Sequence, residues 1–321
     1  MYGERVVAVL CVVVAALCIR CGDAKGVEDE VGPSMLIAHM KEIETTNIRA
    51  DMTFKLVRTR GSGRTIRQEG RFEIVRGKGR FRAEGTDTLT GKEEKRALAY
   101  VPGLLGEIWS DTPLPGEAHG KSGFGSIWRG KQVNDKFLSR GRDGNWLFGY
   151  DFFLEDSNLP RRLSEADTER LTLGEKTEVE GGALVTLRAA LDVGNYALTF
   201  DSRVGWNLVK IRIERRPEEH SGFVSEESYR EMVFEGDITY TKVDGVFLPE
   251  SGTARLQKTP IESSAKSPET TDFEIAMTNI ALAGSLEDDA FRITWPVDSV
   301  AYDNSVKRNF FVNAQGEFEA F

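Results

Sequence analysis

The sequence RADMTFKLVRTR, Arg49 to Arg60, alternates apolar and polar side chains. Such alternation is typical of a β-strand with one buried face, because successive side chains of a strand point to opposite sides of the sheet. The apolar members are Ala50, Met52, Phe54 and Leu56, and they alternate with Asp51, Thr53 and Lys55. This stretch therefore predicts the first strand of a half-buried sheet.

An amphipathic helix is predicted immediately before this strand. Leu36, Met40 and Ile43 are spaced as on one face of an α-helix, and Ser34 is its candidate N-cap. The change from helical to strand spacing near Arg49 marks the point where the sheet begins.

The same two-residue alternation returns along most of the chain. The further predicted strands are RFEIVRG (71–77), GRFRAEG (79–85), EKRALAY (94–100), EIWS (107–110), ALVTLRAAL (183–191), YALTF (196–200), WNLVKIRIER (206–215), YREMVFEGDITYT (229–241) and DFEIAMTNIAL (272–282). Short turns between such strands require antiparallel neighbours. The pattern predicts one antiparallel sheet of about ten strands, and open sheets of that size curl or close.

A further hairpin is predicted at VDGVFLPESGTARL, Val243 to Leu256. Asp244-Gly245 favours a type I′ turn, which pairs Lys242 with Phe247 and places Phe247 on the same face as Tyr240. Pro249 lacks an N–H group, so it predicts a strand edge or a β-bulge.

Residues 101–181 interrupt the alternation and are rich in Gly, Pro and Trp. Within them, LSEADTERL (163–171) predicts a short helix capped by Ser164. This region is interpreted as a helical and irregular insertion that serves as a lid.

The N-terminus predicts a secretion signal over residues 1–24. Arg5 precedes the apolar run VVAVLCVVVAALCI (6–19), which is shorter than the roughly 20 residues of a spanning helix. Cleavage after Ala24 is one reading, and a retained anchor or a lipid-modified cysteine is the other. All three cysteines, Cys11, Cys18 and Cys21, lie in this leader, so the mature domain has no thiol for catalysis, a metal or a disulfide.

No catalytic, metal or cofactor site is predicted. His39, His119 and His220 are the only histidines, and no two have metal-ligand spacing. The segment GEAHGKS (116–122) is one residue too short between its glycines for a phosphate-binding loop. A net charge of -9 argues against nucleic-acid binding, which requires basic excess. The chain is therefore expected not to be an enzyme.

One segment is strongly basic within this acidic protein. It contains Arg58, Arg60, Arg64, Arg67, Arg76, Lys78 and Arg80. One interpretation is a patch for anionic partners such as a membrane surface. The other is the outward face of two hairpins, where basic side chains deter edge pairing.

The succession of leader, amphipathic helix, RADMTFKLVRTR, DSRVGWNLVKIRIER, VDGVFLPESGTARL and FEIAMTNI resembles the LolA/LolB-like superfamily of bacterial lipoprotein-localisation factors. The resemblance implies a mainly β fold, a half-open antiparallel barrel with an N-terminal helix and a lid, whose cavity takes up acyl chains of lipids or lipoproteins. The domain organisation then reads as signal 1–24, linker 25–33, half-barrel domain 34–290 with insertion 101–181, and a C-terminal extension 291–321 that packs on the domain. Both the insertion and the extension depart from a minimal carrier.

The predicted cavity lining consists of Met52, Phe54, Leu56, Phe72, Ile74, Leu98 and Tyr100. A filled core that holds no ligand has the same sequence pattern, so both interpretations stay open. The function predicted is an exported, non-enzymatic lipid- or lipoprotein-binding protein of the periplasm or cell envelope. The alternative is an envelope sensor of the same fold that binds another exported protein.

Overall fold

The computed structural model of the protein describes residues 31–77, 80–89, 91–101, 103–110, 121–130, 159–216, 219, 229–261 and 267–320, and all structural statements refer to these ranges. The predicted signal, and the question of its cleavage or lipidation, lie outside them. Residues from Pro33 onward belong to one compact unit.

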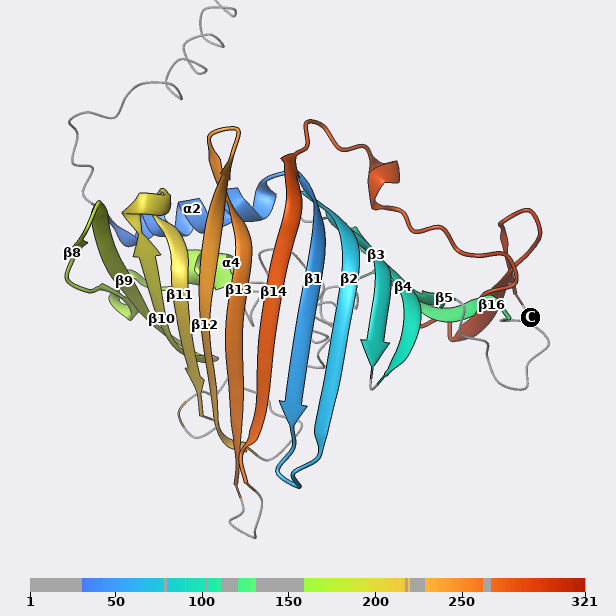
Figure 1. Ribbon diagram of the computed structural model, residues 1–321, viewed down its shortest axis with the longest axis horizontal. Helices are drawn as coiled ribbons and strands as arrows, with labels where there is room; N and C mark the ends of the chain where they lie inside the picture. The colour runs from blue at the N-terminus through green and yellow to red at the C-terminus, as the bar shows by residue number, and fades with distance from the viewer. Residues whose placement is uncertain are drawn as a thin grey trace, which may run out of the picture. The chain divides into compact units, whose positions relative to one another are not determined.

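The described residues form a single sheet of seventeen strands (Figure 1). The first six are β1 (Ile48–Thr59), β2 (Thr65–Gly77), β3 (Arg80–Leu89), β4 (Lys92–Val101), β5 (Leu104–Ser110) and β6 (Gly123–Arg129). The next eight are β7 (Leu171–Leu173), β8 (Thr177–Val179), β9 (Gly182–Leu191), β10 (Gly194–Asp201), β11 (Asn207–Arg215), β12 (Tyr229–Val243), β13 (Val246–Pro260) and β14 (Glu269–Leu282). The last three are β15 (Val300–Asp303), β16 (Arg308–Val312) and β17 (Phe318–Ala320).

The pairings place these strands in an open row that does not close into a barrel. Both β7 and β8 pair with β9, and the row continues through β10, β11, β12, β13 and β14. There β14 pairs with β1, and the row goes on through β2, β3, β4, β5 and β6 to β15, β16 and β17. All pairs are antiparallel except β6 with β15. The predicted single antiparallel sheet, open and curled, is confirmed, and it has more strands than the sequence indicated.

Two α-helices lie on one face of the sheet, α2 (Pro33–Thr45) and α4 (Leu159–Glu165). Helix α2 contacts α4, β7 and β11, and its apolar stripe of Leu36, Met40 and Ile43 is buried. The helix begins at Pro33, so its N-cap position is Gly32 and the predicted N-cap, Ser34, is wrong by two positions. Proline is favoured at the first helical position because its missing N–H is not needed there.

The face that meets α2 is called the inner face. On β1, Ile48, Ala50, Met52, Phe54 and Leu56 are buried and the residues between them are exposed, as the alternation predicts. Arg76 of β2 lies opposite Ile48 and donates a hydrogen bond of 2.8 Å to the carbonyl oxygen of Ile43, near the end of α2. The other side of the sheet is called the outer face.

The β12–β13 hairpin has the predicted register. Asp244 and Gly245 have φ angles of 48° and 86°, as a type I′ turn requires, and Lys242 lies opposite Phe247. The pairing then shifts, because Tyr240 is opposite Pro249 and Thr239 is opposite Ser251. Pro249 therefore lies at a β-bulge, in a part of β13 that pairs only with β12, since pairing with β14 begins at Ser251.

The predicted insertion, residues 101–181, contains β5 to β8, α4 and the short 3₁₀ helix η3 (Thr168–Arg170). Residues 111–120 and 131–158 of it lie outside the described ranges. The helix predicted over residues 163–171 is wrong in position, because α4 ends at Glu165. Ser164 does not cap a helix start but donates to the carbonyl oxygen of Arg161 at 2.7 Å.

The C-terminal tail, residues 283–320, crosses the outer face. Leu286 and Phe291 pack against Val75 of β2, and Phe291 belongs to the 3₁₀ helix η5 (Asp288–Phe291). The tail then reaches the far side of the row, where β15 pairs with β6 (Figure 1). It thus covers an edge of the sheet that would otherwise be open.

Candidate functional site

The seven predicted cavity residues lie on the inner face of three strands. Met52, Phe54 and Leu56 belong to β1, Phe72 and Ile74 to β2, and Leu98 and Tyr100 to β4. Six of them are at most 5% exposed, and Tyr100 is half-buried. Their burial is the property that the alternation predicts.

Phe54 and Phe72 form the aromatic centre of this group. Their rings are stacked with centroids 6.0 Å apart. Gly70 lies opposite Phe54, and a Cβ atom at Gly70 would lie 2.3 Å from Phe54 Cε1 and 2.5 Å from Phe72 Cε2. The two rings therefore occupy the space that a side chain at position 70 would need.

The apolar inner face extends far beyond these strands. Following the pairings, one row across the sheet contains Leu187, Leu198, Ile211, Gly236, Ala254, Phe273 and Leu56. A neighbouring row runs through Ile238, Gly252, Ile275 and Phe54. The sequence predicted a buried face on each strand, but only the register shows that these faces form a continuous apolar surface.

A buried ionic network lies on the inner face where it reaches β3, β4 and β5. Arg96 Nη1 donates to Asp87 Oδ2 at 3.1 Å, and Arg96 Nε donates to Glu107 Oε1 at 3.0 Å. Gln68 Nε2 also donates to Asp87 Oδ2, at 2.6 Å, and the Arg96 guanidinium lies 5.3 Å from the Trp109 ring. Glu107 and Arg96 are 0% and 4% exposed. The apolar surface therefore ends at a polar cluster.

Burial raises the pKa of Asp87 above its ordinary value, although the charge of Arg96 and the hydrogen bonds from Gln68 and Arg96 oppose this. The sequence pattern did not predict this network. One sequence feature does indicate it. Arg96 is two residues from Leu98 in EKRALAY, so both side chains lie on the inner face of the strand.

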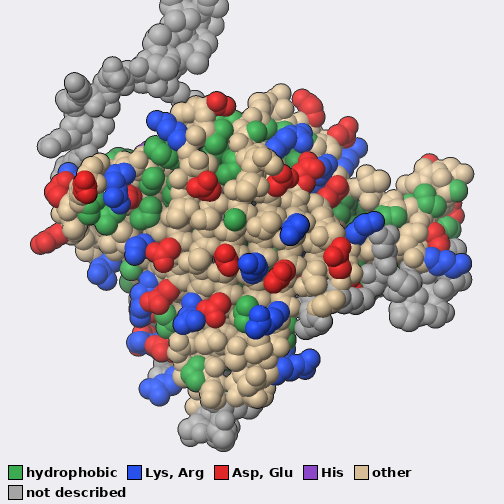
Figure 2. All heavy atoms as spheres, in the orientation of Figure 1, with side chains coloured by type: hydrophobic (Ala, Val, Ile, Leu, Met, Phe, Trp, Pro, Cys, Tyr) green, Lys and Arg blue, Asp and Glu red, His purple; other side chains and the backbone are tan. Residues whose placement is uncertain are grey.

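The basic segment does not form one surface patch. Arg60, Arg64 and Arg67 are exposed at the open end of the β1–β2 hairpin, whereas Arg76 is buried against α2 near its other end. Two further members form ion pairs, Arg58 with Glu269 at 2.5 Å and Arg80 with Asp288 at 2.5 Å. Lys78 lies outside the described ranges. Including Arg76 in an anionic-partner patch was wrong, because its guanidinium is buried and donates a hydrogen bond to the Ile43 carbonyl oxygen of α2. Figure 2 shows basic and acidic side chains interspersed over the outer face.

An apolar pocket of about 550 Å³ lies between the outer face of β4, β5 and β6 and the tail; we call it the tail pocket. Ala99, Val101, Leu104, Gly106 and Ile127 form its sheet side. The tail side consists of Phe291, Ile293, Trp295 and Phe318, and Arg80, Arg129, Arg292 and Asp288 complete the lining. Sequence reasoning missed it, because it joins residues that are distant in the chain.

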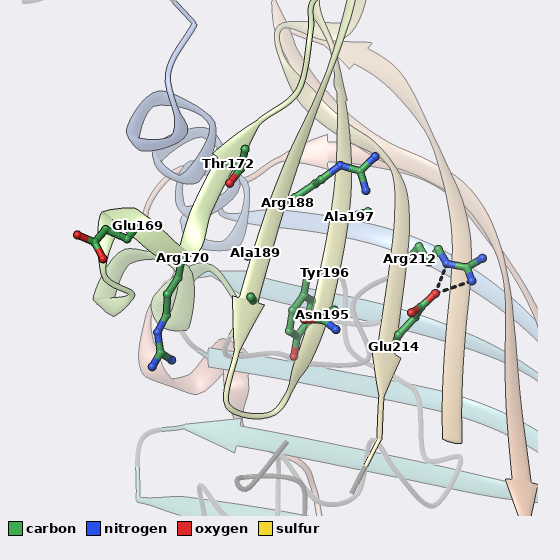
Figure 3. A pocket seen from close by; sticks show the side chains of 11 residues that line it. Glu169, Arg170, Thr172, Arg188, Ala189, Asn195, Tyr196, Ala197, Arg212 and Glu214 are labelled. Carbon is green, nitrogen blue, oxygen red and sulfur yellow. Dashed lines mark hydrogen bonds and ion pairs between the residues drawn. The ribbon is translucent and has the colours of Figure 1, made fainter. Parts of the chain in front are cut away.

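A smaller pocket of about 350 Å³ lies over β9, β10 and β11 (Figure 3). Thr172, Arg188, Ala197 and Arg212 follow one another across neighbouring strands at this place. Arg212 is already hydrogen-bonded to Glu214 at 2.8 Å. The lining mixes both charges and favours no class of ligand.

Two negative observations concern the described part of the chain. It contains no group of three or more His, Cys, Asp or Glu side chains that could hold a metal ion. None of its helices has the length and apolarity of a membrane span. His39 is half-buried on α2, whereas His119, His220 and most of GEAHGKS lie outside these ranges.

No family model matches the chain, and no curated protein matches it. Among solved structures, it is similar to a DUF1329 family protein from Desulfovibrio piger, with 13% identity, 81% of this chain and 95% of that chain covered, and a TM-score of 0.40. It is also similar to a LolA superfamily protein from Nitrosomonas europaea, with 10% identity, 82% and 98% coverage, and a TM-score of 0.41. A lipovitellin structure is similar at 10% identity over 77% of this chain and 26% of that chain, with a TM-score of 0.33.

Proposed function

We propose that this protein is an exported, non-enzymatic component of a bacterial cell envelope that binds the acyl chains of lipids or lipoproteins against the inner face of its sheet. The observation on which the proposal rests is the continuous apolar surface that the pairings form from β9 to β4. Export is inferred from the predicted signal in residues 1–24.

The apolar surface is much larger than the helices that pack on it. Strands lie about 4.8 Å apart, so the distance from β9 to β4 along the row is about 45 Å. Helix α2 has 13 residues and is therefore about 20 Å long. It lies close to α4, β7 and β11, and Ile43 near its end accepts a hydrogen bond from Arg76 of β2, but a helix of this length cannot span the whole row.

The side chains of this surface select for an apolar chain rather than for a head group. Met, Phe, Leu and Ile dominate the rows, with small residues such as Gly236, Gly252 and Ala254 between them. Such a surface excludes water and offers dispersion contacts but few hydrogen-bond partners. It fits flexible acyl chains, which need no directional contacts.

The test is photocrosslinking inside the native envelope. A benzophenone amino acid replaces Phe54 on the inner face in one protein and Thr53 on the exposed side of the same strand in the other. After irradiation and purification, intact-mass measurement identifies what each position has captured. We expect a lipid mass at position 54 and none at position 53.

Two results would overturn the proposal. Capture of lipid at both positions to the same extent would show non-specific contact with the membrane. An empty inner face together with a stoichiometric exported protein partner in native mass spectrometry would support the sensor alternative instead.

A further inference from the structure

The tail pocket is separate from the surface used in the proposed function, because it lies on the opposite side of the sheet. The pairings place Ala99 opposite Gly106 and Gly106 opposite Ile127, and the parallel row contains Val101, Leu104 and Arg129. The side chains of all six positions lie on the outer face of the sheet. The floor of the pocket is thus a short apolar patch that ends in a guanidinium group.

Small side chains create the hollow, and the tail covers it. Ala99 and Gly106 leave space above the sheet, and a Cβ atom at Gly106 would lie 3.4 Å from Ile293 Cδ1 and 3.8 Å from Trp295 Cζ2. Trp295 meets Phe318 edge to face at 5.4 Å. Two aromatic rings and an isoleucine therefore form the wall opposite the floor.

The pocket still exposes apolar surface to water. Leu104 and Phe318 are 38% and 41% exposed, and they are two of the five large exposed hydrophobic side chains in the described ranges. Exposed apolar side chains that gather around a cavity of this size are typical of a ligand site.

The arginines of the lining differ in what they already bind. Arg80 is engaged with Asp288, with the Leu286 carbonyl oxygen at 3.0 Å, and with the Phe291 ring at 4.4 Å, so it holds the tail in place. Arg292 forms an exposed pair with Asp289 at 2.9 Å.

The guanidinium of Arg129 is hydrogen-bonded through Nε, and its terminal nitrogens are available to bind a ligand. Its Nε donates to Asp303 Oδ2 at 2.9 Å, and its two terminal nitrogens have no partner among the described residues. Asp303 is buried and also accepts from the Ser305 amide at 2.9 Å. Burial acts to raise the pKa of Asp303, but the hydrogen bonds from Arg129 and the Ser305 amide hold it below its ordinary value, so the carboxylate stays charged and orients Arg129.

We propose that the tail pocket binds a fatty acid, with the acyl chain between the β4–β6 floor and the aromatic wall and the carboxylate on the terminal nitrogens of Arg129. The lining has three guanidinium groups and one carboxylate within a chain of net charge -9, so it favours an anionic head. A guanidinium fork matches the geometry of a carboxylate and forms charge-assisted hydrogen bonds with it.

Isothermal titration with decanoate and with decanol tests the proposal on the full chain. We expect both to bind the natural protein. Arg129→Gln should weaken decanoate about tenfold and leave decanol unchanged, because only the first has a charged head. Arg188→Gln, which changes an exposed outer-face arginine on β9, is the matched control and should alter neither. Gly106→Leu fills the hollow and should abolish both.

Several outcomes would overturn the proposal: no decanoate binding, equal loss of decanoate and decanol in Arg129→Gln, or unchanged binding in Gly106→Leu. The last result would place decanoate elsewhere, including the inner face, and would leave the proposed function standing. If Gly106→Leu does not fold, quenching by 10-bromodecanoate replaces it. Trp295→Phe should then remove most of the quenching seen in the natural protein, and undiminished quenching would refute the site.

Discussion

At the scale of single residues, the inner face is a tightly packed surface in which neighbouring side chains depend on one another. Phe54 is 4% exposed and lies on the row that joins β14 to β1. Its ring extends over Gly70, whose missing side chain gives it room. Alternation in the sequence predicted the burial of Phe54, but the need for glycine at position 70 follows from a contact across strands that the sequence does not display.

Replacing Phe54 with Asp should destabilise the domain by about 4 kcal/mol or more, because the change leaves a cavity and an unpaired charge on a buried surface. Urea unfolding followed by circular dichroism measures this. Thr53→Asp is the matched control, since Thr53 is exposed on the same strand, and it should cost less than about 1 kcal/mol. Similar losses for the two variants would contradict the assignment of the inner face.

Asp87 gives a prediction about pH. Burial raises its pKa in the folded protein above the ordinary value of 3.8, which applies to the unfolded chain. At a pH between the unfolded and the folded pKa, the carboxyl group keeps its proton in the folded state and has lost it in the unfolded state. Stability from this group therefore falls as pH rises through that window. The difference in unfolding free energy between the natural protein and Asp87→Asn should decrease from low to neutral pH.

The matched control for Asp87→Asn is Asp237→Asn, at an exposed carboxylate on β12. Urea unfolding of both variants across the acid range separates the local effect from general acid denaturation. A difference that stays flat, or that grows with pH, would show that the Arg96 charge outweighs burial at Asp87.

At the scale of elements, hairpins were the most predictable part of the structure. The β12–β13 turn was readable because Asp-Gly specifies positive φ angles, and the pairing of Lys242 with Phe247 follows from the turn. Helix positions were harder to derive, because Ser164 and the residues after it have the composition of a helix start. The chain nevertheless ends α4 at Glu165, and Leu171 becomes part of β7, paired with Ala189 of β9. The pairing of β7 with β9, a strand that follows later in the chain, therefore outweighed the local preference for a helix.

Gly245→Ala should destabilise the protein by about 1 to 2 kcal/mol, because alanine is strained at the left-handed φ of 86° that this glycine adopts. Gly284→Ala is the control, since that glycine has no neighbour within 4 Å and no positive φ. It should change stability by less than about 0.5 kcal/mol. Thermal unfolding of the two variants side by side checks the difference, and equal midpoints would argue against the type I′ turn.

At the scale of the whole molecule, the sheet is completed by contacts between distant parts of the chain. β1 lies between β2, its neighbour in sequence, and β14, and Asn279 Nδ2 donates to Asp51 Oδ2 at 2.6 Å across a separation of 228 residues. The tail adds a second long connection, from β15 to β6. No turn chemistry specifies either pairing, which is why the sequence predicted a curled sheet but neither its strand order nor the tail pocket. Both proposed lipid sites depend on these long connections.

The β1–β14 pairing can be tested with an engineered disulfide. Thr53 lies opposite Ala276 on the outer face, so Thr53→Cys with Ala276→Cys should form a bond under mild oxidation when the three natural cysteines are replaced by serine. Because the bond closes a loop of more than about 200 residues, it should raise the free energy of unfolding on the order of 5 kcal/mol in the chain-entropy account.

The control for this pair is Thr53→Cys with Thr278→Cys, since Thr278 lies opposite Asp51 instead. Diagonal neighbours are about 7 to 8 Å apart, beyond the usual span of a disulfide, so this pair should oxidise poorly. Non-reducing gel mobility and urea unfolding measure both proteins. Preferential bonding in the diagonal pair would mean that β1 and β14 are out of register by two residues, and the inner-face rows from β9 to β4 would then no longer align.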